Sequence, residues 1–312
     1  MYIQPLYTAL TVAGLAVVGA VSDRRSSFWG EAGHRLTAQA AAAGLPSDMP
    51  QFFRDAAPQL AYLNPEPDRW RTGLERLHDG ALEGATAPDH FLDLELIPAA
   101  SRAGALAAKD RYAFADTLRA HNVDPSAAGA LPFAVLEVTQ RLRVGFRQWR
   151  AAPNDQVRSW IEARILNDAG ILGHYVADGS NPAHTTIHYN GWVGANPNGF
   201  ATDNRFHGRF ESAYVQTHIK LSDILPAVAS TPKVLPGFRS AIITYFLQTH
   251  AEVERLYQLD KAAPFNAETT VPENKAFAVT RLGAGATMLR DLWYSAWMTS
   301  VAPVTAAPQP DR

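Results

Sequence analysis

The sequence predicts an all-α protein that folds as a single mostly helical domain. Stretches rich in Ala and Leu place apolar residues at helical spacing, and clusters of Pro, Gly and Asn separate these stretches. Alternating runs of β-branched residues, which are typical of strands, are scarce. Of the 312 residues, 47% are hydrophobic and 19% are charged. The chain is therefore too apolar for disorder and long enough to bury a full core.

The first helix is expected from Glu31 to Ala43, where Ala and Leu dominate and Gly44-Leu45-Pro46 ends the pattern. A second helix is expected from Asp48 to Tyr62. The segment Asn64-Pro65-Glu66-Pro67 then forces a turn, because proline has no amide N–H with which to continue a helix.

The middle of the chain has the strongest helical patterns. Helices are expected from Ser101 to His121 and from Leu131 to Arg150, separated by the turn residues NVDPSAAG. Asn154 is placed to cap a third helix that runs to about Asp178, with its apolar residues on one side. Residues 179–202 are loop-like, and helical patterns return in 203–219, 234–262 and 272–298.

Residues 1–28 are interpreted as a signal peptide with a short pro-segment. The apolar run from Leu6 to Val21 is shorter than a membrane-spanning helix, and Val18-Gly19-Ala20 fits the small-x-small cleavage pattern. An ordinary buried helix is the alternative, because no Lys or Arg precedes the run. We expect a secreted or periplasmic protein with no stable membrane insertion, one domain at 29–300 and a flexible tail at 301–312.

The composition limits the chemistry that this chain can perform. It has no cysteine, which excludes disulfides, thiolate catalysis and cysteine-based zinc fingers. Its net charge of −2 excludes a uniformly basic surface that coats nucleic acid. Ten histidines remain, so metal chemistry has to use imidazole, carboxylate and backbone ligands.

Two predicted helical segments carry the same pair of residue types four positions apart: His174 with Asp178, and His207 with Glu211. This spacing puts both side chains on one helix face, where they can bind one ion, and imidazole with carboxylate suits zinc. An exposed ion pair is the alternative for either pair taken alone. The loop after Asp178 adds His184 and a further histidine, and this density favours a metal site.

Further ligand-type residues precede these pairs: Trp29-Gly30-Glu31-Ala32-Gly33-His34, Asp68 in EPDRWR, and His90 in DHFLD. In chain order, the patterns WGxxGH, D-x-x-R, HF-[IL]-D, H-x3-D-x5-H and H-x3-[DE] resemble the three-zinc phosphodiesterases. This superfamily comprises the S-one/P-one single-strand nucleases and the zinc-dependent phospholipases C. The resemblance extends from Trp29 to Glu211 and, more weakly, into RLGAGATMLRDLW. It implies one helical domain with a three-zinc cleft.

The resemblance also implies a role for each ligand of the three Zn²⁺ ions. The first zinc would be held by Asp68, His90, His174 and Asp178. The second would be held by His34 and by the amino group and carbonyl oxygen of Trp29, with Asp178 bridging the two ions. The third would be held by His184, His207 and Glu211.

In such a site, water activated by the paired ions would attack phosphorus, and the third ion would stabilise the leaving oxygen. The candidate catalytic residues are Asp68, Asp178 and Arg71. Arg71 could clamp a phosphate oxygen, with a surface ion pair as its alternative role. Asn181 and His188, in the loop after Asp178, are candidate substrate-binding residues.

Trp29 can bind zinc through its amino group only where it is the first residue of the mature protein. Cleavage after Ala20 would leave Val21 at the terminus. Either a second cut frees Trp29, as we expect, or the second zinc is held with fewer ligands. In the loop after Asp178, Asn181 and Ala183 depart from the residues usual in the family but keep the metal spacing.

We expect a monomeric zinc-dependent phosphoric ester hydrolase of the nuclease type, acting on single-stranded nucleic acid or 3′-nucleotides. The short WGxxGH spacing, Arg71 and the 23-residue gap from His184 to His207 favour the nucleases. Glu211 and the segment FHGRFESAYV favour a phospholipase C acting on phospholipid head groups, which stays open as the second interpretation. A non-catalytic secreted zinc-binding protein is the third.

Overall fold

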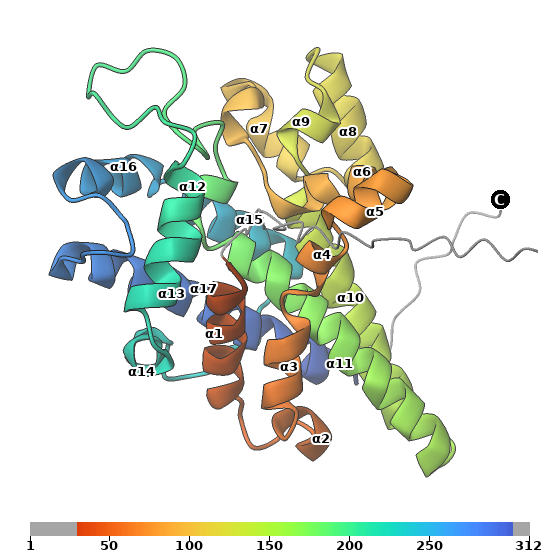
Figure 1. Ribbon diagram of the computed structural model, residues 1–312. Helices are drawn as coiled ribbons and strands as arrows, with labels where there is room; N and C mark the ends of the chain where they lie inside the picture. The colour runs from red at the N-terminus through yellow and green to blue at the C-terminus, as the bar shows by residue number, and fades with distance from the viewer. Residues whose placement is uncertain (1–29, 302–312) are drawn as a thin grey trace, which may run out of the picture.

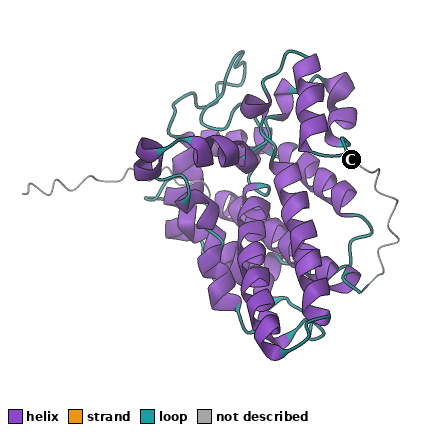
Figure 2. Ribbon diagram, turned by 90° about the vertical axis from the view of Figure 1, so that its right-hand side faces the viewer, coloured by secondary structure: helices purple, strands orange, loops and turns teal. Residues whose placement is uncertain are grey.

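The computed structural model describes residues 30–301. In this part of the chain, helices are joined by loops and no strand is present (Figure 2). The structure confirms the predicted class, a single mostly helical, all-α domain. The expected signal segment at 1–28, Trp29 and residues 302–312 of the tail lie outside the described residues.

A pair of long helices forms the centre of the domain. Helix α10 (Leu131–Arg150) and helix α11 (Asp155–Asp178) are joined by a short loop and lie side by side (Figure 1). The Asn154 side chain caps α11, because its Oδ1 accepts the Val157 N–H at 2.9 Å. Both helices match their predicted ranges.

Helices α1 (Gly30–Ala43), α3 (Ala57–Leu63) and α17 (Pro272–Thr299) pack against α11. The main core between these helices contains an aromatic cluster in which the Phe53 ring lies 5.3 Å from Trp293 and 5.6 Å from Phe146, between ring centroids. Both contacts have the inclined geometry that aromatic rings prefer. Trp293 is fully buried, so this cluster anchors α17 to the centre of the domain.

Two predicted helices are each split in the structure. The range from Asp48 to Tyr62 contains α2 (Gln51–Arg54), which starts after Pro50, and α3. Pro58, in the first turn of α3, lacks the N–H that would continue α2 into α3. The range 101–121 is divided between α7 (Ala99–Leu106), which begins two residues earlier, and α8 (Arg111–Ala120). The break falls before Asp110, whose side chain accepts the Ala113 N–H at 2.8 Å and starts α8 as a new helix.

The predicted helix at 203–219 is shorter and irregular. It begins at α12 (Phe206–Gly208), widens into a π-helical segment η4 (Arg209–Tyr214) and ends in α13 (Val215–His218). Isolated π-helical segments such as η4 are frequent at functional sites. Further along the chain, the predicted range 234–262 contains α15 (Phe238–His250) and α16 (Val253–Ala262).

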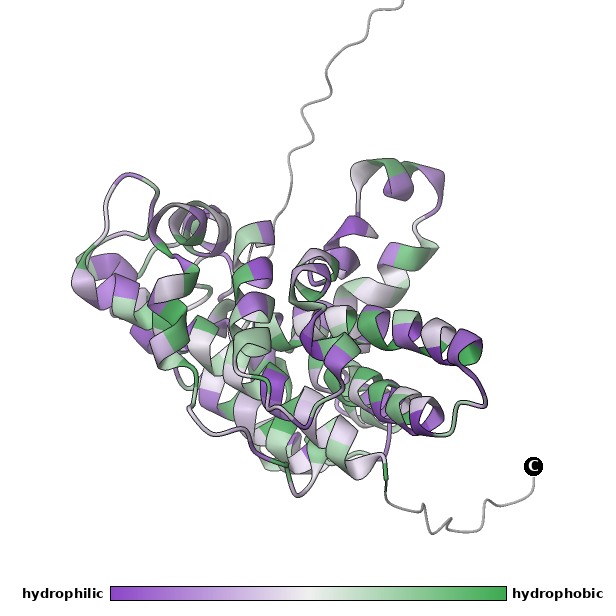
Figure 3. Cartoon of the chain, turned by 90° about the horizontal axis from the view of Figure 1, so that it is seen from below, coloured by the Kyte–Doolittle hydropathy of each residue, from purple (hydrophilic) through white to green (hydrophobic). Residues whose placement is uncertain are grey.

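Short helical segments fill the connections. They are α4 (Glu66–Arg69), α5 (Gly73–His78), α6 (Ala81–Thr86), η1 (Ala87–His90), η2 (Leu94–Leu96), α9 (Pro125–Ala128), η3 (Pro182–His184), α14 (Leu221–Ile224) and η5 (Leu225–Ala227). The loop at 179–202 is confirmed, with η3 as a single turn within it. Hydrophilic and hydrophobic residues share most helices, as an amphipathic bundle requires (Figure 3). Within the described part of the chain, no helix has the length and apolar character needed to cross a membrane.

Helix α11 positions the candidate site. Its first turns extend away from the body, whereas its C-terminal end reaches the middle of the domain, close to α1 and α4 (Figure 1). Every residue from Asp168 to Asp178 is buried. The last turn of α11 therefore presents polar side chains inside the protein, surrounded by segments that are distant in sequence.

Candidate metal centre

The structure brings together all eight described ligands that the sequence predicts. They come from separate elements: His34 from α1, Asp68 from α4, His90 from η1, His174 and Asp178 from α11, His184 from η3, His207 from α12 and Glu211 from η4. Their ligand atoms form three groups, each with its atoms within 4.8 Å of one another: His34, His174 and Asp178; Asp68, His90 and His174; and His184, His207 and Glu211. Because the first two groups share a histidine, we call them together the paired group.

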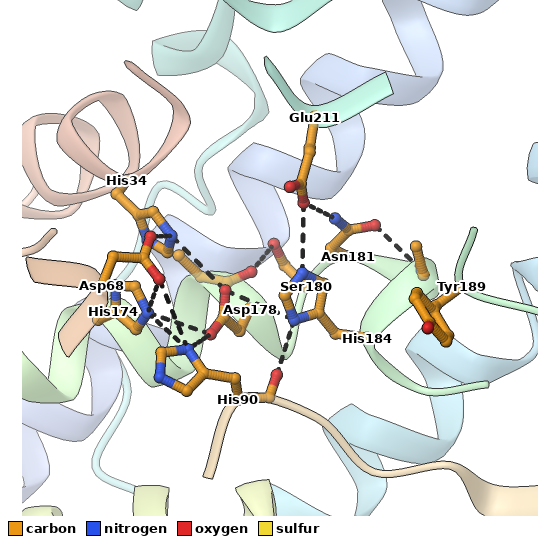
Figure 4. A network of polar contacts seen from close by, with 12 residues as sticks. His34, Asp68, His90, His174, Asp178, Ser180, Asn181, His184, Tyr189 and Glu211 are labelled. Carbon is orange, nitrogen blue, oxygen red and sulfur yellow. Dashed lines mark hydrogen bonds and ion pairs between the residues drawn. The ribbon is translucent and has the colours of Figure 1, made fainter. Parts of the chain in front are cut away.

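Asp178 lies at the centre of the paired group and is fully buried (Figure 4). Its Oδ2 lies 3.1 Å from His90 Nδ1 and 3.3 Å from His174 Nε2. Its Oδ1 faces the opposite side and lies 3.5 Å from His34 Nε2. One carboxylate thus directs an oxygen toward each half of the paired group, which is the arrangement of a bridging ligand.

Asp68 closes the paired group from the side of α4. Its Oδ1 lies 3.8 Å from His174 Nε2 and 3.9 Å from His90 Nδ1, and its Oδ2 lies 4.0 Å from His34 Nε2. The Asp68 side chain keeps a relative exposure of 20%, whereas the His34 side chain is fully buried. A molecule from solvent would therefore reach the paired group past Asp68.

The third group adjoins the paired group. Glu211 Oε2 lies 2.9 Å from His207 Nε2 and 3.3 Å from His184 Nε2. The other imidazole nitrogen of His184, Nδ1, lies 3.6 Å from Asp178 Oδ1. One histidine thus belongs to the third group and contacts the central carboxylate of the paired group.

These separations are of the size expected between ligands of one metal ion. Ligands about 2.0–2.1 Å from a tetrahedral zinc lie about 3.3 Å from one another, close to the observed spacing. Ligation also requires that the imidazole nitrogen facing the metal carries no proton, which holds in a neutral imidazole whose other nitrogen donates to an acceptor. Three histidines show such a contact to a main-chain oxygen: His174 Nδ1 to Asn64 O at 3.0 Å, His184 Nδ1 to His90 O at 2.7 Å and His207 Nδ1 to Tyr189 O at 3.2 Å.

Buried polar atoms give a second test of the fit. His34 Nε2, Asp178 Oδ1 and Glu211 Oε1 are buried and make no hydrogen bond within the described part of the chain. Leaving such atoms unsatisfied costs about 1–3 kcal/mol each. Each belongs to one of the three groups, so bound cations would satisfy all of these atoms.

Burial and neighbouring charges set the protonation of the groups. Burial lowers the pKa of His90 to about 3, and burial together with the nearby His174 holds the pKa of His34 well below its usual value. Burial opposes ionisation of Asp178, but the surrounding imidazoles outweigh it and hold its pKa well below the usual range. Neutral imidazole beside ionised carboxylate is the state in which both bind metal.

His184 behaves differently from these two histidines. Burial acts to lower its pKa, but Asp178 and Glu211 outweigh burial and raise the pKa to about 9. A cation that binds at the third group would therefore displace a proton from this imidazole.

Arg71, a predicted phosphate ligand, follows α4 and is partly buried. Burial lowers the pKa of its guanidinium, and the charges of Asp68 and Asp178 act in the opposite direction. Arg71 is therefore close enough to interact with the carboxylates of the paired group.

The two predicted substrate-binding residues already interact with the protein. Asn181 donates from Nδ2 to Glu211 Oε2 at 3.2 Å, and its Oδ1 accepts the Ala183 N–H at 3.0 Å. The His188 ring stacks on Trp192 at 3.9 Å between centroids, and its Nδ1 accepts the Val193 N–H at 3.0 Å. Asn181 thus orients Glu211, a ligand of the third group. His188 stabilises the loop that follows Asp178.

One important residue escapes sequence reasoning. Asn64 is fully buried and contacts both His34 and His174, yet in the sequence it only begins a proline-rich turn. No motif marks it, because one of its two contacts is made by the main chain.

Comparison with protein-family models, with curated proteins and with solved structures finds no match to this chain. Its function therefore has to be argued from the site. The described residues form an all-α fold in which buried His, Asp and Glu groups could hold metal ions.

Proposed function

We propose that this protein is a three-zinc phosphodiesterase of the nuclease type, acting on single-stranded nucleic acid or 3′-nucleotides. The observation that carries the proposal is the convergence of eight ligand side chains, spread over residues 34–211, into three adjacent groups. Their contact through Asp178 and His184 supports one composite centre over three separate sites. Isolated surface ion pairs would not converge in this way.

The residues around the groups suit hydrolysis of a phosphate ester. Bound zinc would lower the pKa of water and supply positive charge for a phosphate group. Asp68, the partly exposed ligand of the paired group, lies where substrate would enter. Arg71, within range of the Asp68 charge, would donate to a phosphate oxygen and orient the ester.

The third group offers a surface for the remainder of the substrate. The Tyr189 ring lies edge-on to His207, at 5.9 Å between centroids, and Tyr189 is 50% exposed. Its main-chain oxygen also accepts from His207, which holds the Tyr189 backbone beside the metal ligands. An exposed aromatic face of this kind suits a nucleobase.

A specific observation keeps phospholipase C as the second candidate. Leu74 and Leu77, one helical turn apart on α5, are 76% and 86% exposed. They come three and six residues after Arg71 in the chain, so exposed apolar side chains are close in sequence to the proposed phosphate ligand. Exposed leucines at this position would favour contact with a lipid surface.

The first experiment measures metal content and then compares substrates. We expect close to three zinc ions per chain, and hydrolysis of single-stranded DNA, RNA or a 3′-nucleotide. Hydrolysis of phosphatidylcholine alone would establish phospholipase C instead. Three zinc ions without any hydrolysis would indicate a binding protein, and one ion or none would overturn the three-zinc centre.

Arg71→Lys tests the phosphate contact, because lysine keeps the charge but lacks the planar pair of donors. We expect KM to rise at unchanged zinc content. Arg69→Lys is the matched control, since Arg69 pairs with Glu66 at 2.7 Å and has no proposed role in catalysis. Equal effects of the two changes would contradict the role of Arg71.

We further propose that the protein is exported and that cleavage before Trp29 completes the second zinc position. N-terminal sequencing of the secreted protein is expected to begin at Trp29. A start at Val21 would count against the amino-group ligand.

A further inference from the structure

Asn64, the C-cap residue directly after α3, contacts two ligands of the paired group. Its side-chain Oδ1 lies 3.1 Å from His34 Nδ1, and its main-chain oxygen lies 3.0 Å from His174 Nδ1. The two imidazoles stack on each other at 3.9 Å between centroids, with planes inclined by 13°. A single buried residue therefore contacts one imidazole from α1 and one from α11.

Both contacts impose the same tautomer. A carbonyl oxygen carries no proton, so each Nδ1 has to be the donor. The opposite nitrogen, Nε2, is then left with a lone pair in each neutral ring. These Nε2 atoms face the two oxygens of Asp178, at 3.5 Å from Oδ1 for His34 and 3.3 Å from Oδ2 for His174.

The close approach of α3 to α11 makes this geometry possible. A Cβ atom added at Gly173 would lie 2.3 Å from Asn64 Nδ2, and one added at Gly170 would lie 2.3 Å from Leu63 Cβ. Real Cβ atoms do not approach neighbouring atoms so closely. Gly173, directly before His174 in the chain, thus provides the space in which Asn64 sits.

We propose that Asn64 is a positioning residue that presets both halves of the paired metal group, through its side chain for His34 and through its main chain for His174. This inference rests on the paired site of the proposed function. It adds that one residue orients a histidine in each half of the paired group, whereas in the third group the main-chain oxygens of His90 and Tyr189 orient His184 and His207.

Zinc titration against a chromogenic chelator tests the proposal. Asn64→Leu removes the side-chain acceptor only, so we expect one of the three zinc positions to weaken by about 10- to 100-fold, the usual effect of losing an outer-shell partner. Asn64→Asp keeps an acceptor and is expected to retain wild-type affinity. Wild-type affinity in Asn64→Leu, or equal losses in both variants, would overturn the side-chain role.

Gly170→Ala tests the main-chain contact, because the added methyl group would lie 2.3 Å from Leu63 Cβ and 3.2 Å from the Leu63 carbonyl carbon, which is bonded to Asn64. The main chain of α3 has to move and carries Asn64 with it, so we expect two zinc positions to weaken while the third keeps its affinity. Asn274→Leu is the control for Asn64→Leu. Asn274 lies on helix α17, outside the three groups, and like Asn64 it is buried; its side chain donates to Ala263 O at 2.7 Å. Loss of zinc in this control to the same degree would show a general effect of destabilisation.

A measurement that needs neither zinc nor a variant separates this inference from the proposed function. Long-range ¹H–¹⁵N spectra of the zinc-free protein, at a pH where the imidazoles are neutral, report the tautomer of each histidine. We expect the Nδ1–H form for His34 and His174. That result in a protein that binds no zinc would overturn the proposed function alone, whereas an Nε2–H form at either histidine would overturn the role of Asn64.

Discussion

Asp178→Asn is the change that tests the candidate centre most directly. The carboxylate is fully buried and directs Oδ2 toward His90 and His174 and Oδ1 toward His34. Asparagine has the same shape but presents an oxygen to one side and an NH₂ group to the other. At least one half of the paired group therefore loses a ligand and faces a donor in its place.

The expected loss can be estimated from the energetics of zinc sites. The free energy of binding a structural zinc is about 10–16 kcal/mol for four ligands, or about 3 kcal/mol for each ligand. A loss of that size weakens binding about 100-fold. We expect this effect at one paired position or both, and loss of hydrolysis with it, while the third group still binds zinc.

The assay combines zinc competition titration with circular dichroism, which reports whether the helices persist. Asp168→Asn is the matched control on the same helix, because Asp168 is also buried but pairs with Arg141 outside the site. Wild-type zinc affinity in Asp178→Asn would refute the bridging role. Equal zinc loss in the control would attribute the effect to the helix and not to the ligand.

Three further predictions concern stability. Gly170→Ala places a methyl group against Leu63 and should lower the free energy of unfolding, measured in urea, by about 1–3 kcal/mol. Gly104→Ala, where nothing lies within 4 Å of the added atom, should raise the free energy of unfolding by about 0.5–1 kcal/mol. A loss of stability in both variants would contradict the close packing of α3 on α11. Asn154→Ala removes the cap of α11 and should cost about 1 kcal/mol in the same measurement, and an unchanged stability would show that the cap is dispensable. Chelation of zinc should lower the midpoint temperature of thermal unfolding, because free zinc at 100 times its Kd stabilises the folded state by about 2.7 kcal/mol. A midpoint that does not respond to the chelator would contradict the coupling of zinc binding to folding.

The sequence predicted those helices whose boundaries are coded locally. The patterns at 131–150 and 155–178 begin and end at clear signals, such as the Asn154 cap, and the structure confirms both. The single helix expected from Asp48 to Tyr62 is wrong because Pro50 delays its start and Pro58 interrupts a stretch whose apolar residues are otherwise typical of a helix. The break before Asp110 was missed for a related reason, since an N-cap inside a helical pattern resembles an ordinary surface residue.

The candidate ligands were predictable because their residue types are rare and their spacing is regular. What holds them was not predictable, because the acceptors behind His174, His184 and His207 are main-chain oxygens. Every residue has such an oxygen, so no side-chain pattern marks the few that matter. Only the folded chain shows that the carbonyl oxygens of Asn64, His90 and Tyr189 direct these imidazoles.

The same oxygens explain how a buried site of this kind can exist before any cation arrives. Each Nδ1 donates to an acceptor fixed by the main chain, so the rings of His174, His184 and His207 are oriented by the fold itself. The atoms that face the centre of the site are left unsatisfied, which costs free energy: His34 Nε2 and Asp178 Oδ1 are buried without a hydrogen bond in the described part of the chain. A bound cation would satisfy these atoms in a site whose imidazoles the fold already orients. Metal binding should therefore increase the stability of the folded state.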